Sequence, residues 1–218
     1  MKKTILLFSA LLIFGNLSAQ DKAALVNPII GTNGMGHTFP GACVPFGLVQ
    51  LSPDTDTIPH NVDGKYQPRA YEYCAGYQHK DSSIVGFSHT HFSGTGHSDL
   101  GDILIMPATG ELKLNPGTAT DPDGGYRSRF SHDTEVSRPG YYEVMLADYG
   151  VKAQLTATKR VGVHKYTFPK EAKNQRIILD MIHGIYNYDG KVLWTNSRVE
   201  NDTLVTGYRI TNGWARTN

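Results

Sequence analysis

Apolar and polar residues alternate with a period of two through much of the second half of the chain. The clearest run has Val151, Ala153, Leu155 and Ala157 on one side and Lys152, Gln154, Thr156 and Thr158 on the other. Successive side chains of a strand point to opposite faces, so this pattern predicts a half-buried antiparallel strand. No segment after the first twenty residues carries a helical period, which favours an all-β fold.

Further strands are predicted at short intervals along the chain. Their ranges are 44–51, 83–87, 102–107, 141–146, 161–168, 176–183, 191–199 and 203–211, the last two joined through Asn201-Asp202. Residues 52–69 are polar, contain three prolines and show no period, so we expect a long loop there. Many short strands linked by turns predict an antiparallel β-sandwich.

The first nineteen residues have the pattern of a secretory signal peptide. A basic start at Met1–Lys3 precedes the apolar run Ile5–Phe14, and Leu17-Ser18-Ala19 supplies a cleavage site of small residues. The apolar run is too short to cross a bilayer, and no cysteine marks a lipid anchor. We therefore expect residues 1–19 to be removed and residues 20–218 to form one exported domain, periplasmic or extracellular.

The composition excludes several classes of partner. The formal net charge is +1 and the basic residues are scattered, so neither a nucleic-acid surface nor a membrane-binding helix is predicted. The two cysteines are Cys43 and Cys74. Export permits a disulfide between them, but two small buried thiols are the favoured interpretation.

The segment Gly86–Asp102 has the strongest chemical signal, with three histidines, two acids and four glycines. His89 and His91 share a face if the backbone is extended. The preferred interpretation is polar-ligand binding through His89, His91 and Ser93, with Thr95 shaping the loop. The alternative is a zinc site completed by His97 or Asp99.

Two other segments add candidate binding residues. The glycine-rich loop 26–41 lacks the lysine of a phosphate-binding loop, and it presents His37 and Phe39 at a bend. Tyr71 and Tyr77 lie in an aromatic run, and exposed tyrosines stack well on sugar faces, although many such tyrosines only cover a core.

Two catalytic or metal-binding patterns are incomplete. Ser93-Gly94-Thr95-Gly96 lacks the nucleophile elbow of serine hydrolases. Asp121-Pro122-Asp123-Gly124 opens like a calcium loop but lacks the later ligands, so we expect a solvated turn.

Several longer motifs stand in order along the mature chain. They are Val26-Asn-Pro-Ile-Ile-Gly-Thr, Gly36-His-Thr-Phe-Pro-Gly, Val44-Pro-Phe-Gly-Leu-Val-Gln-Leu-Ser-Pro-Asp54, Ile84-Val-Gly-Phe-Ser-His-Thr-His-Phe-Ser-Gly-Thr-Gly96, Tyr126-Arg-Ser-Arg-Phe-Ser-His132, Arg138-Pro-Gly-Tyr-Tyr142, Gly207-Tyr-Arg and Gly213-Trp-Ala. Together they resemble the amino-terminal domain of glycoside hydrolase family 92, the calcium-dependent exo-acting α-mannosidases. The resemblance covers essentially all of the mature chain.

This resemblance implies a galactose-mutarotase-like supersandwich and an inverting mechanism in which calcium helps to bind and distort the mannoside. Family members continue into a helical-barrel domain that carries the general acid, the general base and most calcium ligands, and we expect these groups to lie outside the 218 residues of this chain. An inverting glycosidase needs two carboxyl groups about 6.5–9.5 Å apart. The resemblance gives that role to neither Asp99 nor Asp102. Where this chain has Tyr71, family members often have tryptophan, which offers a larger platform for a sugar.

We therefore expect the amino-terminal part of an α-mannosidase that acts on mannose-containing glycans of N-glycan or mannan type and is inactive alone. The expected pocket wall is His37, Phe39, Tyr71, Tyr77, His89, His91 and Ser93. His91→Ala is expected to impair activity much more than folding. Without its partner domain, the chain is expected to expose an apolar patch. The alternatives are a free-standing carbohydrate-binding module and a metal-dependent hydrolase built on His89, His91 and His97.

Overall fold

The computed structural model of the protein describes residues 21–56, 58–94 and 100–213. The strands are β1 (Ala42–Cys43), β2 (Gln50–Asp54), β3 (Asn61–Val62), β4 (Lys65–Tyr66), β5 (Ser83–Ile84), β6 (Gly86–Ser88), β7 (Leu104–Ala108), β8 (Ser128–Arg129), β9 (Val136–Arg138), β10 (Tyr141–Leu146), β11 (Val151–Ala157), β12 (Gly162–Thr167), β13 (Arg176–Asp180), β14 (Val192–Asn201) and β15 (Leu204–Thr211). Four short 3-10 helices complete the described elements: η1 (Lys22–Leu25), η2 (Pro68–Tyr73), η3 (Pro122–Gly124) and η4 (His132–Thr134). Within the described ranges, no helix has the length and apolar character needed to cross a membrane.

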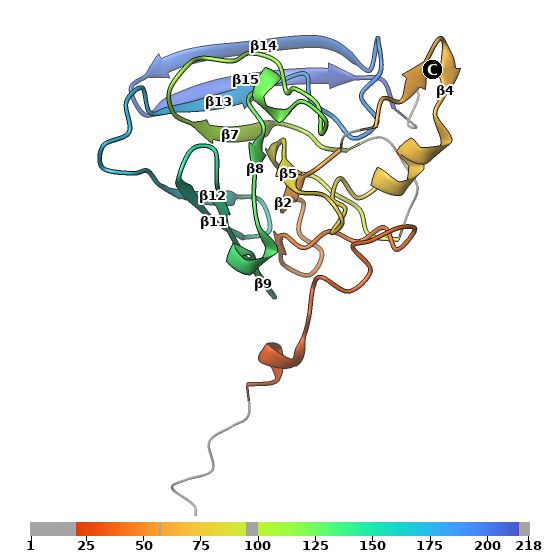
Figure 1. The fold of residues 1–218 in the computed structure, drawn as a ribbon, viewed down its shortest axis with the longest axis vertical. Helices are drawn as coiled ribbons and strands as arrows, with labels where there is room; N and C mark the ends of the chain where they lie inside the picture. The colour runs from red at the N-terminus through yellow and green to blue at the C-terminus, as the bar shows by residue number, and fades with distance from the viewer. Residues whose placement is uncertain (1–20, 57, 95–99, 214–218) are drawn as a thin grey trace, which may run out of the picture.

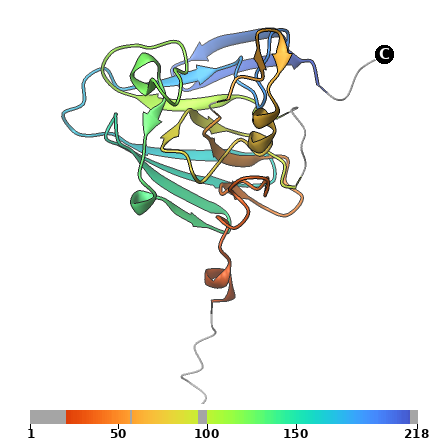
Figure 2. The ribbon, with the colours of Figure 1, turned by 45° about the vertical axis from the view of Figure 1, so that its right-hand side comes forward.

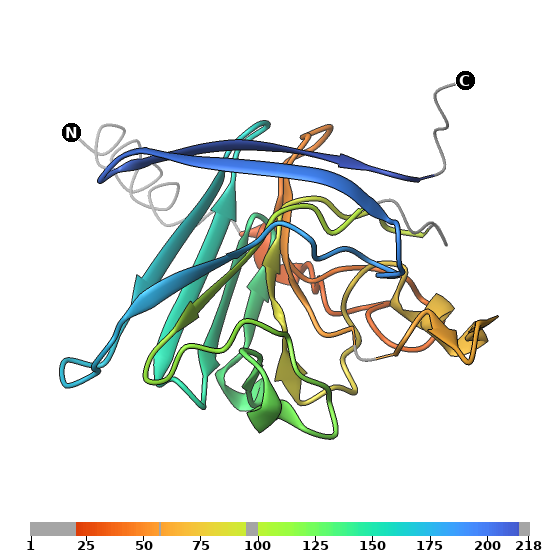
Figure 3. The same ribbon diagram turned by 90° about the horizontal axis from the view of Figure 1, so that it is seen from above.

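Two antiparallel sheets form the sandwich, which confirms the predicted all-β fold. The five-stranded sheet has the order β1-β2-β6-β7-β13, and the four-stranded sheet has the order β12-β11-β10-β9. The long hairpin β14–β15 lies along the outer side of the five-stranded sheet (Figure 1, Figure 2). The loops that connect the first strands gather at one end of the sheets (Figure 3). That end carries the candidate site.

The core lies between the two sheets and follows the alternation seen in the sequence. In β10, Tyr142, Val144 and Leu146 are fully buried, and they pair with Leu155, Ala153 and Val151 of β11. The facing sheet contributes Leu51, Phe87, Leu104 and Met106. Each such side chain contributes about 1.5–3 kcal/mol when buried, so this layer holds β2 and β6 firmly in place. These two strands lead directly into the candidate site.

The hairpin β14–β15 covers the five-stranded sheet incompletely. A cavity of about 490 Å³ lies beneath it, lined by Ile105 of β7, Leu179 of β13 and Val205 of β15, among others. The hairpin also carries apolar side chains that are more than half exposed: Leu193, Trp194, Val199, Val205, Tyr208 and Ile210. These side chains agree with the apolar patch expected from the sequence.

Two predicted segments are corrected around β2. Residues 44–49 turn instead of forming a strand, because the Gly47 N–H donates to the Val44 carbonyl at 3.0 Å and Phe46 adopts φ 58°. The predicted loop 52–69 contains the end of β2, the hairpin β3–β4 and the start of η2. Pro53 is tolerated in β2 because β1 pairs only with Gln50 and Leu51, so that no strand needs its missing N–H.

Both cysteines are free thiols. Cys74 is buried, with its Sγ 2.7 Å from the Tyr186 hydroxyl, whereas Cys43 is exposed. The expectation of two buried thiols is therefore wrong for Cys43, which occupies the outward-facing position of the two-residue strand β1. The predicted signal peptide lies outside the described residues.

Candidate functional site

The glycine-rich loop, η2 and the histidine-bearing bend after β6 meet at one end of the sandwich. The Gly94 N–H donates to the His37 carbonyl at 2.6 Å, which ties the loop to the bend. The ring of His37 packs edge-on against Tyr71, with ring centroids 4.9 Å apart. Phe39 packs against His91 at 5.3 Å. Four predicted wall residues therefore form two packed pairs, His37 with Tyr71 and Phe39 with His91.

The side chain of Gln78 holds the glycine-rich loop through two hydrogen bonds to the backbone of Gly34. The Gly34 N–H donates to Gln78 Oε1 at 2.8 Å, and Gln78 Nε2 donates to the Gly34 carbonyl at 2.9 Å. His37 follows in the left-handed region at φ 50°, and its Nε2 is buried with no hydrogen-bond partner among the described residues. Buried polar atoms nearly always have a partner, so this nitrogen is available to a group from outside these residues.

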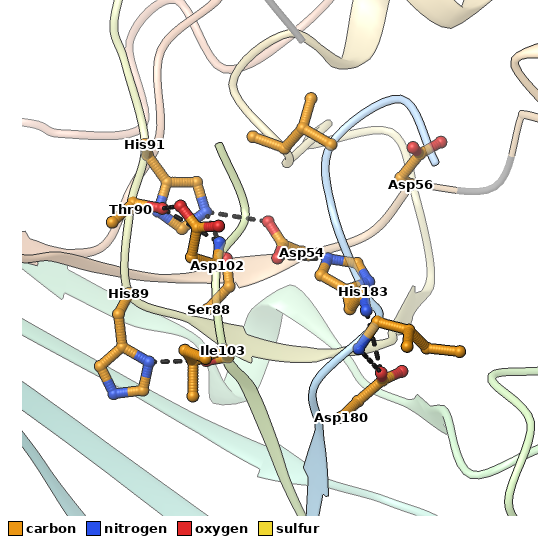
Figure 4. Close-up of polar contacts among 12 residues, drawn as sticks. Asp54, Asp56, Ser88, His89, Thr90, His91, Asp102, Ile103, Asp180 and His183 are labelled. Carbon is orange, nitrogen blue, oxygen red and sulfur yellow. Dashed lines mark hydrogen bonds and ion pairs between the residues drawn. The ribbon is translucent and has the colours of Figure 1, made fainter. Parts of the chain in front are cut away.

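His91 belongs to a buried network and is only 1% exposed. Its Nδ1 lies 2.7 Å from the Gln50 carbonyl, and its Nε2 lies 2.9 Å from Asp54 Oδ1 (Figure 4). Both ring nitrogens of His91 are therefore engaged by buried partners. His91 therefore stabilises the bend from inside the domain. Its ring contacts Phe39.

Asp54 joins His91 to a second histidine far along the chain. Its Oδ2 accepts a hydrogen bond of 2.9 Å from Nε2 of His183, which follows β13. Burial alone would raise the pKa of Asp54, but the charge of His91 and the hydrogen bonds from both histidines hold that pKa well below its usual value. Asp54 is therefore ionised and paired, which suits a rigid support rather than an acid catalyst.

A small cavity adjoins this network. It has a volume of about 190 Å³, and its lining includes Asp56, Arg127 and His183. Burial raises the pKa of Asp56 to about 6. The Arg127 guanidinium donates to the Pro116 carbonyl at 3.0 Å and to Ser83 Oγ at 3.1 Å, so it is fixed in place.

His89 has a different environment from His91, and the two rings point in different directions (Figure 4). The Nδ1 of His89 donates to the Ile103 carbonyl at 2.7 Å, and its Nε2 lies 3.0 Å from Nε2 of His164 on β12. Burial lowers the pKa of His89, which favours the neutral ring. The structure therefore places His89 against the four-stranded sheet, away from Tyr71 and Phe39.

This separation removes the basis for a zinc site built on His89 and His91. The expectation of a shared face required an extended backbone, but β6 ends at Ser88, before either histidine. Each of the two rings is engaged by its own set of partners. His97, Asp99 and Thr95 lie outside the described residues.

Tyr77 is buried, whereas Ser93 is exposed. Tyr77 is 1% exposed and its hydroxyl donates to Glu135 at 2.9 Å, so the exposure predicted for its ring is wrong. Ser93 is exposed on the bend, next to Gly94.

Sequence reasoning did not identify His183, Asp56 or Arg127 as part of this site. Asp54 and His183 are separated by 129 positions, and no local pattern connects them. The only available signal was the position of Asp54 at the end of a longer motif.

The sequence model of the glycosyl hydrolase family 92 N-terminal domain matches residues 25–218. The chain belongs to this family. Its fold agrees with solved family 92 (GH92) structures. Over 88% of the chain, it superposes with a TM-score of 0.78 and 46% sequence identity on the GH92 α-mannosidase from Bacteroides thetaiotaomicron solved in complex with mannoimidazole. A GH92 inverting mannosidase from the same species aligns over 90% of the chain with a TM-score of 0.62 and 26% identity.

The GH92 relatives are much longer than this chain. The chain covers 23% of each of the two mannosidases from Bacteroides thetaiotaomicron. An uncharacterized secreted glycosidase from Arthroderma benhamiae is 30% identical over 158 residues, which represent 68% of this chain and 18% of that protein. The chain therefore spans less than a quarter of the length of these relatives.

Proposed function

We propose that this chain is the amino-terminal domain of an exported, inverting exo-α-mannosidase that acts on mannose-containing glycans and is inactive alone. The observation that carries the proposal is the family membership together with 46% identity to an α-mannosidase bound to mannoimidazole. The proposed mature domain is residues 20–218, with residues 1–19 as its signal peptide. The protein then acts in the periplasm or outside the cell.

The proposed role of the domain is to form one wall of the mannose pocket. Tyr71, which is 37% exposed, offers a ring face to a sugar, and the ring of His37 supports it through an edge-on contact. Phe39 and Ser93 extend the same surface. His91 and His89 act behind it as positioning residues.

The catalytic carboxylates are proposed to come from outside this chain. Within the described residues, Asp102 accepts a hydrogen bond of 2.7 Å from Thr90 and lies 3.3 Å from Nη2 of Arg209, so it is held as part of the scaffold. Inversion requires two carboxyl groups on opposite faces of the sugar, with space for water. A carboxy-terminal domain is proposed to supply both groups.

Calcium, which the family implies, does not fit the described residues. A calcium ion prefers six to eight oxygen ligands. Within the described ranges, the cluster with metal-ligand spacing consists of two imidazoles and one carboxylate. Asp54 is already paired with two histidines. Calcium is therefore proposed to bind mainly to residues outside this chain.

The proposal is tested by comparing this chain with the polypeptide encoded by the extended reading frame. The chain alone is expected to hydrolyse no α-mannoside, and the longer protein is expected to do so. In the longer protein, Tyr71→Ala is expected to raise KM about 10-fold, since aromatic contacts contribute about 0.5–1.5 kcal/mol. Tyr141→Ala on β10, which removes a partly exposed tyrosine from the outer side of the four-stranded sheet, is the control. Hydrolysis of an α-mannoside by the chain alone would disprove the proposal that the catalytic carboxylates lie outside it.

The burial of His91 changes one prediction from the sequence. Removing a partner from a buried ion pair costs about 3–5 kcal/mol. His91→Ala is therefore expected to destabilise the domain as well as impair activity, and it is a poor test of ligand contact. If the extended protein is inactive while the chain alone binds mannan, the carbohydrate-binding module is the better account.

A further inference from the structure

A second cluster of ligating side chains lies outside the proposed mannose wall. It consists of His79, His132 and Glu135, and one ligand atom of each lies within 4.8 Å of the other two. His132 Nδ1 is 2.6 Å from Glu135 Oε2. The rings of His79 and His132 are tilted by 34° to each other, with centroids 3.9 Å apart. Two imidazoles and a carboxylate thus converge on one point from two separate segments.

The Glu135 carboxylate is held in one orientation by its hydrogen-bond partners. The Glu135 side chain is only 3% exposed. Its Oε1 accepts hydrogen bonds from the Tyr142 hydroxyl at 2.6 Å and from the Tyr77 hydroxyl at 2.9 Å. Ligands of bound metals are typically oriented by such outer hydrogen bonds. The two tyrosines fix the direction of the carboxylate before any ion arrives.

We propose that His79, His132 and Glu135 bind one divalent transition-metal ion, with Zn²⁺ as the best chemical match. Imidazole nitrogen and carboxylate oxygen are typical zinc ligands, and three protein ligands leave the fourth position to water. This donor set is too rich in nitrogen and too small for calcium. The site is therefore distinct from the calcium chemistry that the family implies.

The cluster needs only a small adjustment to close on an ion. Ligand atoms at about 2.0–2.1 Å from a tetrahedral zinc are about 3.4 Å from one another. Spacings of up to 4.8 Å must therefore shrink by at most about 1.4 Å, and the 2.6 Å between His132 Nδ1 and Glu135 Oε2 must open by about 0.8 Å. The His132 side chain, which is 37% exposed, makes this adjustment by exchanging its hydrogen bond to Glu135 for the ion, whereas the two tyrosines keep Glu135 in place.

The bound ion would tie together parts of the domain that are distant in sequence. His79 lies between η2 and β5, and its N–H donates to the Thr32 carbonyl at 2.8 Å in the glycine-rich loop. His132 and Glu135 flank the turn η4, which leads into β9 of the four-stranded sheet. The ion therefore anchors the segment that also holds the glycine-rich loop through Gln78.

The test is calorimetric titration of the chain with ZnCl₂, supported by the visible spectrum of the Co²⁺-loaded protein. We expect one equivalent of Zn²⁺ to bind and tetrahedral Co²⁺ absorption to appear. Loss of an outer hydrogen bond typically weakens metal binding 10–100-fold, so Tyr142→Phe is expected to weaken it about 10-fold. His132→Asn, which removes a direct ligand, is expected to weaken it more.

Asp133→Asn is the matched control, because Asp133 is an exposed acid on the same turn. It is expected to leave the affinity unchanged. Glu135→Gln, which keeps an acceptor for both tyrosines, is a second ligand variant, and circular dichroism checks the folding of each. Absence of saturable binding, or equal loss in Asp133→Asn and His132→Asn, would overturn the proposal. The readout is metal binding, so its outcome is independent of mannosidase activity.

Discussion

The pair formed by His89 and His164 predicts a specific loss of stability in mild acid. The Tyr166 hydroxyl donates to His164 Nδ1 at 2.6 Å, His164 Nε2–H donates to His89 Nε2 at 3.0 Å, and His89 Nδ1–H donates to the Ile103 carbonyl at 2.7 Å. Every ring nitrogen is satisfied while both rings are neutral. A proton added to His89 would place two N–H groups against each other.

The magnitude follows from the pKa of His164. Burial, and then the charge of His89, lowers this pKa from its ordinary value of 6.5 to about 3. Between these two values the unfolded chain binds more protons than the folded one, so stability is full above pH 6.5 and falls as the pH decreases toward 3. Going from about pH 7.5 to about pH 5 therefore costs about 2 kcal/mol through His164 alone. The lowered pKa of His89 adds a loss of the same sign.

The assay is urea unfolding followed by far-UV circular dichroism at a series of pH values. His164→Gln is the informative variant, because its amide donates to His89 and accepts from Tyr166 without titrating. We expect it to lose about 2 kcal/mol less than the wild-type chain over this pH range. Lys165→Gln, at an exposed position of the same strand, is the control and should keep the wild-type slope. An unchanged slope in His164→Gln would refute the reasoning.

Two further predictions concern the support of the candidate site. Gly76 has φ +80°, and an added Cβ would lie 2.1 Å from Asp54 Oδ1, so Gly76→Ala should destabilise the domain by at least about 2 kcal/mol in urea unfolding. Gly140→Ala is the control, because Gly140 has φ +73° with open space around it, so that this variant measures only the cost of the backbone conformation. An equal loss of stability in both variants would contradict the predicted clash between the added Cβ and Asp54. Arg209 on β15 donates to the His183 carbonyl at 2.6 Å, so Arg209→Met should weaken the attachment of the hairpin by about 1.5–3 kcal/mol and speed hydrogen exchange in β15. Arg198→Met, at an exposed arginine of β14, should leave that exchange unchanged, and equal rates in the two variants would exclude the anchoring role.

Several features of the protein were determined by local sequence. The alternation around Val151 and Leu155 predicted β11 and its buried face, and Asn201-Asp202 predicted the turn between β14 and β15. These features depend on the period of a strand and on turn chemistry, which a few adjacent residues specify. The ordered motifs likewise identified the family, because they are read directly from the chain.

The roles of individual site residues were decided by tertiary structure. His89 and His91 are separated by one residue, yet one contacts β12 and the other pairs with Asp54. Tyr71 and Tyr77 share one aromatic run, yet one is exposed and the other buried. His183 reaches Asp54 only because β13 and β2 belong to the same sheet. Local sequence specifies the path of the backbone, whereas the partner of each side chain depends on which distant segment packs against it.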